Sequence, residues 1–136
     1  MTANPQCCSA DTPLNEVARL MVECDCGEIP VVDNTKKLVG VVTDRDIVCR
    51  AVAKDLNTAA VKAEEVMTCP VISVSEDCTL DDVLAKMEEH QIRRVPVFVD
   101  GTGCICGIIS QADVALHAQE EETGEMVKEV SRDSVH

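Results

Sequence analysis

An internal repeat constrains the fold of this chain more than any other feature of its sequence. Met1-Thr2 recurs 66 residues later as Met67-Thr68, and Pro30-Val31 recurs at the same spacing as Pro96-Val97. The same spacing carries Ser9, Asp11, Leu14, Val17 and Met21 onto Ser75, Asp77, Leu80, Val83 and Met87. After one residue is inserted within positions 100–103, the spacing becomes 67 and carries Gly40, Thr43 and Asp46 onto Gly107, Ser110 and Asp113. A register of this length does not arise by chance, so we expect two copies of one structural unit.

Both copies predict the same order of elements. Apolar residues spaced i, i+3, i+4 and i+7 predict an amphipathic helix from Leu14 to Met21 and another from Leu80 to Met87. Thr12-Pro13 is expected to start the first of these helices, and Thr79 the second. Pairs of short apolar runs joined by polar turns then predict one hairpin per copy, at residues 29–33 with 38–42 and at 95–99 with 105–109. A second helix should begin after Thr43 and after Ser110, and short extended segments should lead each copy at 5–9 and 71–75.

A repeat of roughly 60 residues is marginal as an independent hydrophobic core. We therefore expect the two copies to pack face to face about a pseudo-twofold axis. The first copy is expected at residues 1–54, a linker at 55–66 and the second copy at 67–118. An acidic, polar and partly helical tail is expected at 119–136.

Composition argues against several classes of protein. The formal net charge of −13 repels DNA and RNA, and a chain with no Trp, no Tyr and one Phe has no aromatic platform for stacking bases. No run approaches the roughly 20 apolar residues that cross a bilayer, and the first eleven residues do not resemble an export signal. We expect a cytoplasmic protein that binds neither nucleic acid nor membrane.

Nine cysteines and three histidines are the residues most open to metal or redox chemistry. Without an export signal, a disulfide framework is not expected. Three of the cysteines, Cys8, Cys26 and Cys106, match the apolar residues Val74, Ile92 and Val39 of the other copy, which favours a role as core filler. The Cys104-Ile-Cys106 pair leaves soft-metal binding or thiol redox sensing open, because residues two apart on a strand share a face. The histidines show no ligand spacing, and no metal site is expected.

No catalytic pattern occurs in the chain, neither a glycine-rich phosphate loop nor an arrangement of nucleophile and base. We expect a protein that is not an enzyme and has no obligatory cofactor. The motif that stands out is Gly40-Val-Val-Thr-Asp-Arg-Asp46, repeated as Gly107-Ile-Ile-Ser-Gln-Ala-Asp113, each after an Ile/Val-Pro-Val strand.

The motif places a hydroxyl and a carboxylate where a strand gives way to a helix. Backbone N–H groups without helical partners should face outward there and attract an anion. Asp46 and Asp113, three residues after Thr43 and Ser110, can accept two hydrogen bonds from a vicinal diol such as that of ribose. The alternative interpretation is structural: the hydroxyls are N-caps and the aspartates are partners of the helix dipole.

The doubled pattern resembles the CBS domain, and the tandem arrangement resembles a Bateman module, over residues 1 to about 118. The resemblance implies an α+β fold of two β-α-β-β-α repeats that binds AMP, ADP, ATP or a related adenosyl ligand such as NAD or S-adenosylmethionine. It implies that Asp46 and Asp113 bind ribose, and that Thr43, Ser110, Arg93 and Arg94 reach phosphate. Arg45 and Arg50 lie near the second helix of copy one, where either can aid a phosphate or form a surface salt bridge.

The adenine contacts implied by the resemblance come from the opposite repeat. The Asp113 site would recruit Thr2, Cys26, Gly27 and Ile29, and the Asp46 site would recruit Thr68, Val71, Ile92 and Val95. Glu28 stands in copy one where Arg94 stands in copy two, and it would repel phosphate. The hypothesis is therefore that the Asp113 site is the better one. The alternative for Arg93 and Arg94 is a solvated helix end.

Such modules pair as homodimers through their helices, which makes Val17, Met21, Val83 and Met87 the expected contact stripe. The output would be a change of shape or pairing that alters a regulated protein, whose identity the sequence does not indicate. Two other functions stay open. One is a constitutive interaction module with an empty cleft, and the other is a cysteine-based metal or redox sensor.

Overall fold

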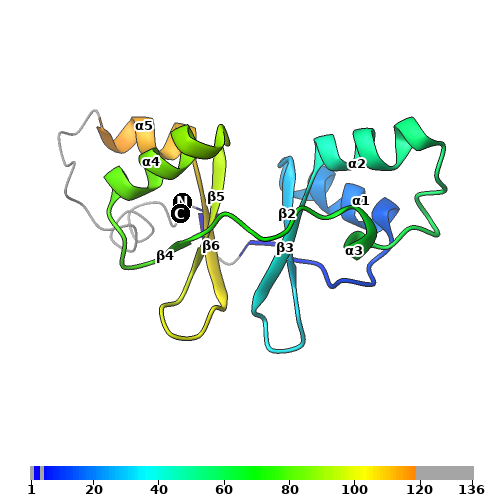
Figure 1. Ribbon diagram of the computed structural model, residues 1–136, viewed down its shortest axis with the longest axis horizontal. Helices are drawn as coiled ribbons and strands as arrows, with labels where there is room; N and C mark the ends of the chain where they lie inside the picture. The colour runs from blue at the N-terminus through cyan, green and yellow to red at the C-terminus, as the bar shows by residue number, and fades with distance from the viewer. Residues whose placement is uncertain (1, 4, 119–136) are drawn as a thin grey trace. The chain divides into compact units, whose positions relative to one another are not determined.

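Each copy of the repeat contains a β-hairpin with its helices to one side in the computed structural model, which describes residues 2–3 and 5–118 (Figure 1). The chain forms two units: one spans residues 6–71, and the other runs from residue 72 onward and includes the strand at residues 2–3. We call them the first unit and the second unit. The expected tail at 119–136 lies outside the described residues, and the expected face-to-face packing of the copies stays a prediction.

The first unit follows the predicted order of helix, hairpin and helix. Helix α1 (Leu14–Cys24) precedes the antiparallel strands β2 (Glu28–Val32) and β3 (Leu38–Thr43), and α2 (Asp44–Arg50) follows directly. The short helices η1 (Val52–Lys54) and α3 (Ala63–Val66) complete it. The leading segment touches the hairpin at Cys8, which bridges Val31 in parallel.

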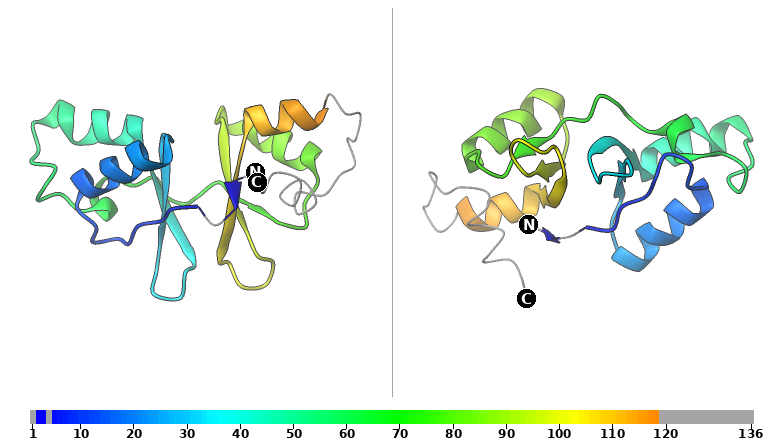
Figure 2. Two further views of the ribbon diagram at one scale, coloured as in Figure 1. Left: turned by 180° about the vertical axis from the view of Figure 1, so that it is seen from behind. Right: turned by 90° about the horizontal axis from the view of Figure 1, so that it is seen from below.

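The second unit repeats this order. Strand β4 (Val74–Ser75) and helix α4 (Leu80–His90) precede the hairpin of β5 (Arg94–Phe98) and β6 (Ile105–Ser110), and α5 (Gln111–Ala118) follows. Strand β1 (Thr2–Ala3) pairs with β6, which gives the sheet order β1-β6-β5-β4. Helices α4 and α5 pack against each other beside the hairpin, as the views from behind and below also show (Figure 2). The predicted helices, hairpins and mixed α+β class are confirmed.

Each copy's first residues pair with the other copy's hairpin, a pairing that the sequence does not predict. Thr2 lies opposite Ile108 in the second unit, and its repeat-mate Thr68 bridges Val41 in the first. The two pairings are equivalent under the repeat. This exchange explains why residues 2–3 fold with the unit that is distant in sequence.

The amphipathic stripes of α1 and α4 face the core of their own unit. Val17 and Val83 are fully buried, and Met21 and Met87 are nearly so. The expectation that these four residues form a dimer stripe is therefore wrong, because the i, i+3, i+7 face is the one that covers the hairpin. Burying each such side chain contributes roughly 1.5–3 kcal/mol to its unit.

The starts of these two helices differ. Thr79 caps α4 as predicted: its hydroxyl accepts from the Asp82 N–H at 3.2 Å, and the Asp82 carboxylate accepts from the Thr79 N–H at 3.1 Å. Thr12 does not cap α1, so that prediction is wrong. Carbonyls of the linker accept from the first N–H groups of α1 instead, Val61 from Leu14 at 2.9 Å and Thr58 from Asn15 at 3.1 Å.

None of the helices in the described part of the chain is both long enough and apolar enough to span a lipid bilayer.

Candidate functional site

The strand-to-helix junction of the first unit is a closed capping box. The Thr43 hydroxyl accepts from the Asp46 N–H at 3.0 Å, and Asp46 Oδ2 accepts from the Thr43 N–H at the same distance. Asp46 is only 8% exposed. The structural interpretation of Thr43 as an N-cap is therefore correct, and it leaves the outer side of the Asp46 carboxylate to other partners.

Thr68 and Arg50 contact the outer side of the Asp46 carboxylate. The Thr68 hydroxyl lies 3.1 Å from Oδ2 and 3.2 Å from Oδ1, and Arg50 Nε lies 3.8 Å from Oδ1. The Arg50 guanidinium also donates to the carbonyls of Val66 at 3.0 Å and Met67 at 3.2 Å. Of the roles considered for Arg50, the structure shows the salt bridge. Thr68, predicted to join the Asp46 site, does lie there.

The junction of the second unit has the same capping geometry with a more exposed carboxylate. Asp113 Oδ2 accepts from the Ser110 N–H at 3.0 Å, and the Ser110 hydroxyl accepts from the Asp113 N–H at 3.1 Å. Burial raises the pKa of the Asp113 carboxyl, but hydrogen bonds with Ser110 are among the interactions that outweigh burial and hold this pKa below its usual value. The carboxylate is therefore ionised at neutral pH and can accept hydrogen bonds on both of its oxygens.

The expected cradle of unpaired N–H groups is not present in the first unit. The Asp44 N–H donates to the Gly27 carbonyl at 2.9 Å, and the Arg45 N–H donates to the Asp44 side chain at 2.8 Å. With the Thr43 and Asp46 N–H groups held in the capping box, the first turn of α2 has no donor left for an anion. In the second unit the Gln111 N–H likewise donates to the Arg93 carbonyl, at 2.7 Å. The backbone of the first junction therefore offers no cradle for an anion.

The cations available are concentrated in the second unit. Arg94 lies opposite Ser110 in the β5–β6 register. The carbonyl of Arg93 accepts a hydrogen bond from the N–H of the first residue of α5. Both arginines are exposed, and no ion pair within the described residues includes either of them. Helix α4 ends at His90, so these arginines do not form the last turn of a helix. In the first unit the residue opposite Thr43 is Glu28, which is buried.

The predicted adenine contacts divide between the units. Cys26, Gly27, Ile29, Thr68 and Val71 lie in the first unit, and Thr2, Ile92 and Val95 lie in the second. The predicted contacts that join Asp113 to Cys26, Gly27 and Ile29, or Asp46 to Ile92 and Val95, stay predictions. The side chains of Ile29 and Val95 are buried in the cores of their own units, so any contact with adenine there would use their backbone.

The cysteines behave as the repeat alignment predicted. Cys8 is buried, and Cys26 and Cys106 pack at the edges of the cores. Burial raises the pKa of the Cys8 thiol to about 12, and that of Cys106 to about 11. Such thiols are poor nucleophiles at neutral pH. All nine cysteines, which lie within the described residues, are thiols.

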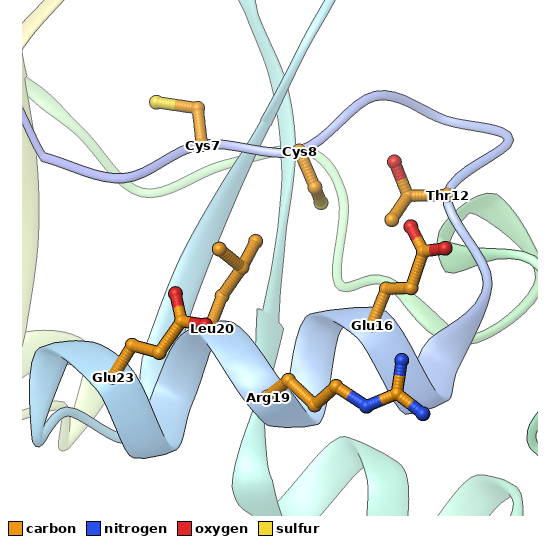
Figure 3. A pocket seen from close by; sticks show the side chains of 7 residues that line it. All are labelled: Cys7, Cys8, Thr12, Glu16, Arg19, Leu20 and Glu23. Carbon is orange, nitrogen blue, oxygen red and sulfur yellow. The ribbon is translucent and has the colours of Figure 1, made fainter.

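A separate cavity of about 340 Å³ lies in the first unit, between α1 and the segment that leads into it. Cys8 points toward the helix, from which Glu16, Leu20 and Glu23 rise to meet the segment (Figure 3). The full lining is Cys7, Cys8, Thr12, Glu16, Arg19, Leu20 and Glu23. The sequence does not indicate this cavity, because its lining joins the polar side of an amphipathic helix to an irregular leading segment.

The CBS domain family model matches residues 1–52 and 63–120, which covers both copies and both junctions. The chain belongs to the CBS domain family. The resemblance stated from the repeat and its two Thr/Ser-x-x-Asp motifs is thereby confirmed, together with the tandem arrangement. A CBS pair of this kind is an α+β structure in which each copy contributes one hairpin and one strand-to-helix junction.

Relatives match along almost the whole chain. The Bacillus subtilis protein YlbB is 39% identical over 134 residues, which span 96% of this chain and 88% of that protein. Hypoxic response protein 1 of Mycobacterium tuberculosis is 33% identical over 130 residues, 96% of this chain and 90% of that protein. A crystal structure of Hypoxic Response Protein I with two coordinated zinc ions superposes with a TM-score of 0.79 at 34% identity, covering 86% of this chain and 93% of that one.

Two further solved CBS structures contain adenosyl ligands. The CBS domain pair of protein MJ0100, in complex with 5′-methylthioadenosine and S-adenosyl-L-methionine, has a TM-score of 0.74 at 30% identity over 88% of this chain and 93% of that one. CBSX2 in complex with AMP has a TM-score of 0.76 at 25% identity over 90% of this chain and 94% of that one. Nucleotide-type ligands therefore occur among the structural neighbours of this CBS pair.

Proposed function

We propose that this CBS pair is a regulatory module that binds an adenine nucleotide or a related adenosyl compound and is not itself an enzyme. The candidate ligands are AMP, ADP, ATP, NAD and S-adenosylmethionine. Binding would change the shape or the pairing of the module, as a homodimer in the cytoplasm, and so alter a regulated protein. Nucleic acid and membranes are not expected partners of a chain with a net charge of −13.

The arrangement of Asp113, Arg93 and Arg94 carries the proposal. Within the second unit the β5–β6 register sets Arg94 opposite Ser110, while the Arg93 carbonyl holds the first residue of the helix that carries Asp113. An ionised carboxylate suits the hydroxyls of ribose, and two cations without carboxylate partners among the described residues suit phosphate. A single nucleotide offers both groups a few ångströms apart.

The first unit supports a weaker site of the same kind. Glu28 takes the place of Arg94, and the Asp46 carboxylate is engaged within its own unit. The proposal therefore includes unequal sites, with the one at Asp113 filled first. The AMP of CBSX2 and the S-adenosylmethionine of MJ0100 show which ligand chemistry to try first.

Thermal denaturation with a ligand panel tests the proposal. A ligand that binds only the folded state at 100 times its Kd stabilises it by about 2.7 kcal/mol, which raises Tm by roughly 10 °C for a chain of this size. We expect such a rise with at least one of AMP, ADP, ATP, NAD or S-adenosylmethionine, and none with guanosine or cytidine monophosphate. Unchanged Tm with every adenosyl compound would contradict the proposal and favour a constitutive interaction module.

Zinc binding is the second candidate, because one structural neighbour contains two coordinated zinc ions. Within residues 2–3 and 5–118, no cluster of three or more His, Cys, Asp or Glu side chains is placed to hold a metal ion. Measuring the zinc content of the purified protein distinguishes the two candidates. Stoichiometric zinc, together with no response to the adenosyl panel, would favour a metal sensor.

A further inference from the structure

The carboxylate of Asp46 holds the end of the chain segment that leads from the first copy into the second. We call residues 66–68 the connector. Its Thr68 hydroxyl donates to Asp46, and its Val66 and Met67 carbonyls accept from the Arg50 guanidinium, which itself lies 3.8 Å from Asp46. Asp46, Arg50 and the connector thus form one small network around a single carboxylate.

The network leaves Asp46 little capacity for another ligand. A carboxylate has about four acceptor positions. The Thr43 N–H takes one on Oδ2, the Thr68 hydroxyl shares both oxygens, and Arg50 approaches Oδ1. A ribose diol needs two positions on the same group. A diol that uses both oxygens of Asp46 therefore competes with Thr68 for them and meets Arg50 beside Oδ1.

The backbone holds the connector in the position that makes these contacts. The Thr68 N–H donates to the Val41 carbonyl at 2.7 Å, and the Val41 N–H donates to the Thr68 carbonyl at 3.1 Å. Met67 packs against Gly40, where an added Cβ would lie only 2.5 Å from the Met67 sulfur. The connector is thus seated on β3 next to the junction rather than lying free in solvent.

The second copy lacks one component of this network. The repeat aligns Thr68 with Thr2 but aligns Arg50 with His117. Position 117 therefore offers no arginine four residues after Asp113, where the first copy has Arg50 four residues after Asp46. The two junctions share their capping box and differ at this position.

We propose that Thr68 and Arg50 restrict ligand access to the Asp46 site: they engage its carboxylate in the absence of ligand, and a ribose diol that binds there releases the connector. This inference rests on the proposed function, since it concerns how one of the two nucleotide sites is regulated. Ligand binds only those molecules in which Asp46 is released, so the apparent affinity of the Asp46 site falls in proportion to the fraction of such molecules. By linkage, filling the site loosens the connector to the same extent.

Amide hydrogen exchange without ligand tests whether the network holds the connector. In Arg50→Gln the amides of Met67 and Thr68 should exchange several-fold faster than in the unmodified protein, and Thr68→Val should have a similar effect. Arg19→Gln removes an exposed charge from α1 and is the matched control, with no change expected at the connector. Equal exchange in all four proteins would overturn the inference.

Calorimetry with AMP tests the competition itself. In an Asp113→Asn background, which leaves the Asp46 site as the one to be measured, adding Arg50→Gln should tighten AMP binding about three- to tenfold. Arg19→Gln in the same background should leave AMP affinity unchanged. Saturating AMP should also speed exchange at Thr68 in the background variant.

The outcomes separate this inference from the proposed function. If Arg50→Gln weakens AMP binding, Arg50 is a phosphate ligand and the inference is wrong, although the nucleotide function stands. If AMP binds with unchanged affinity after the substitution, the inference is again wrong and the function again stands. If no adenosyl compound binds any of these proteins, the proposed function fails and the inference fails with it.

Discussion

Arg94 lies directly opposite Ser110 in the antiparallel ladder of β5 and β6. The equivalent pair in the first unit is Glu28 opposite Thr43. The same backbone register thus presents a cation beside one junction and a buried acid beside the other. The duplicated register therefore places side chains of opposite charge beside the two junctions.

The first prediction concerns this charge difference. Arg93→Gln combined with Arg94→Gln should weaken AMP binding about tenfold or more, because charge-assisted hydrogen bonds contribute about 1.5–3 kcal/mol each. The affinity for adenosine, which has no phosphate, should change less than threefold. Calorimetry with both ligands at two salt concentrations measures the effect. An equal loss for adenosine would mean that the arginines support the fold rather than the phosphate.

The second prediction concerns the two helix starts. Thr79→Ala opens the capping box of α4 and should lower the free energy of unfolding by about 1 kcal/mol. Thr12→Ala should cost less, because linker carbonyls and not Thr12 accept from the first N–H groups of α1. Urea denaturation of the two variants provides the comparison. A larger loss in Thr12→Ala would contradict the described start of α1.

Periodicity predicted those elements that depend on repeated apolar positions. The helices at Leu14 and Leu80 and the two hairpins follow from burial patterns several residues long, which leave a strong signal in the sequence. The cap of α1 was mispredicted because its partners, Thr58 and Val61, are more than forty residues away along the chain. Strand β1 was missed because two residues carry no periodicity.

The third prediction concerns pH. Burial raises the pKa of Cys8 in the folded state to about 12, above the ordinary thiol value in the unfolded chain. The folded state therefore keeps a proton that the unfolded state loses. The contribution of Cys8 to stability is complete below about pH 9 and is lost as pH rises toward 12.

The Cys8→Val variant tests this pH dependence. It introduces valine, the residue that stands at the equivalent position 74 of the second copy. Between pH 9 and 11, the unfolding free energy of the unmodified protein should fall relative to that of Cys8→Val. Cys69→Ser, which changes an exposed cysteine, serves as the control. A difference that stays constant over this range would show that Cys8 ionises freely in the folded protein.

The fourth prediction concerns the contact beneath the connector. Gly40→Ala places a Cβ against the Met67 side chain, so Met67 has to move, and we expect a loss of roughly 1–3 kcal/mol in unfolding free energy. Val39→Ala, at the neighbouring and more exposed position, should cost less than 1 kcal/mol. Chemical denaturation measures both. Equal stabilities would mean that the connector does not sit closely on β3.

The motifs predicted the positions of the junctions better than their chemistry. Thr43 and Asp46 were expected to face outward with unpaired N–H groups, but each of those groups has a partner within the first unit. The partners that close Asp46 come from Thr68 and Arg50, and their approach depends on the backbone path of the connector. A linear motif contains no information on that path.

AMP titration calorimetry of Asp113→Asn and Asp46→Asn tests most directly which unit holds the principal nucleotide site. Both variants keep the shape of the side chain and remove the charge. If the second unit holds the principal nucleotide site, Asp113→Asn weakens the tightest AMP binding by tenfold or more, since it removes a charged acceptor worth about 1.5–3 kcal/mol. Asp46→Asn should leave that binding within about threefold. Equal losses in the two variants, or a larger loss in Asp46→Asn, would contradict the claim that the second unit holds the principal nucleotide site.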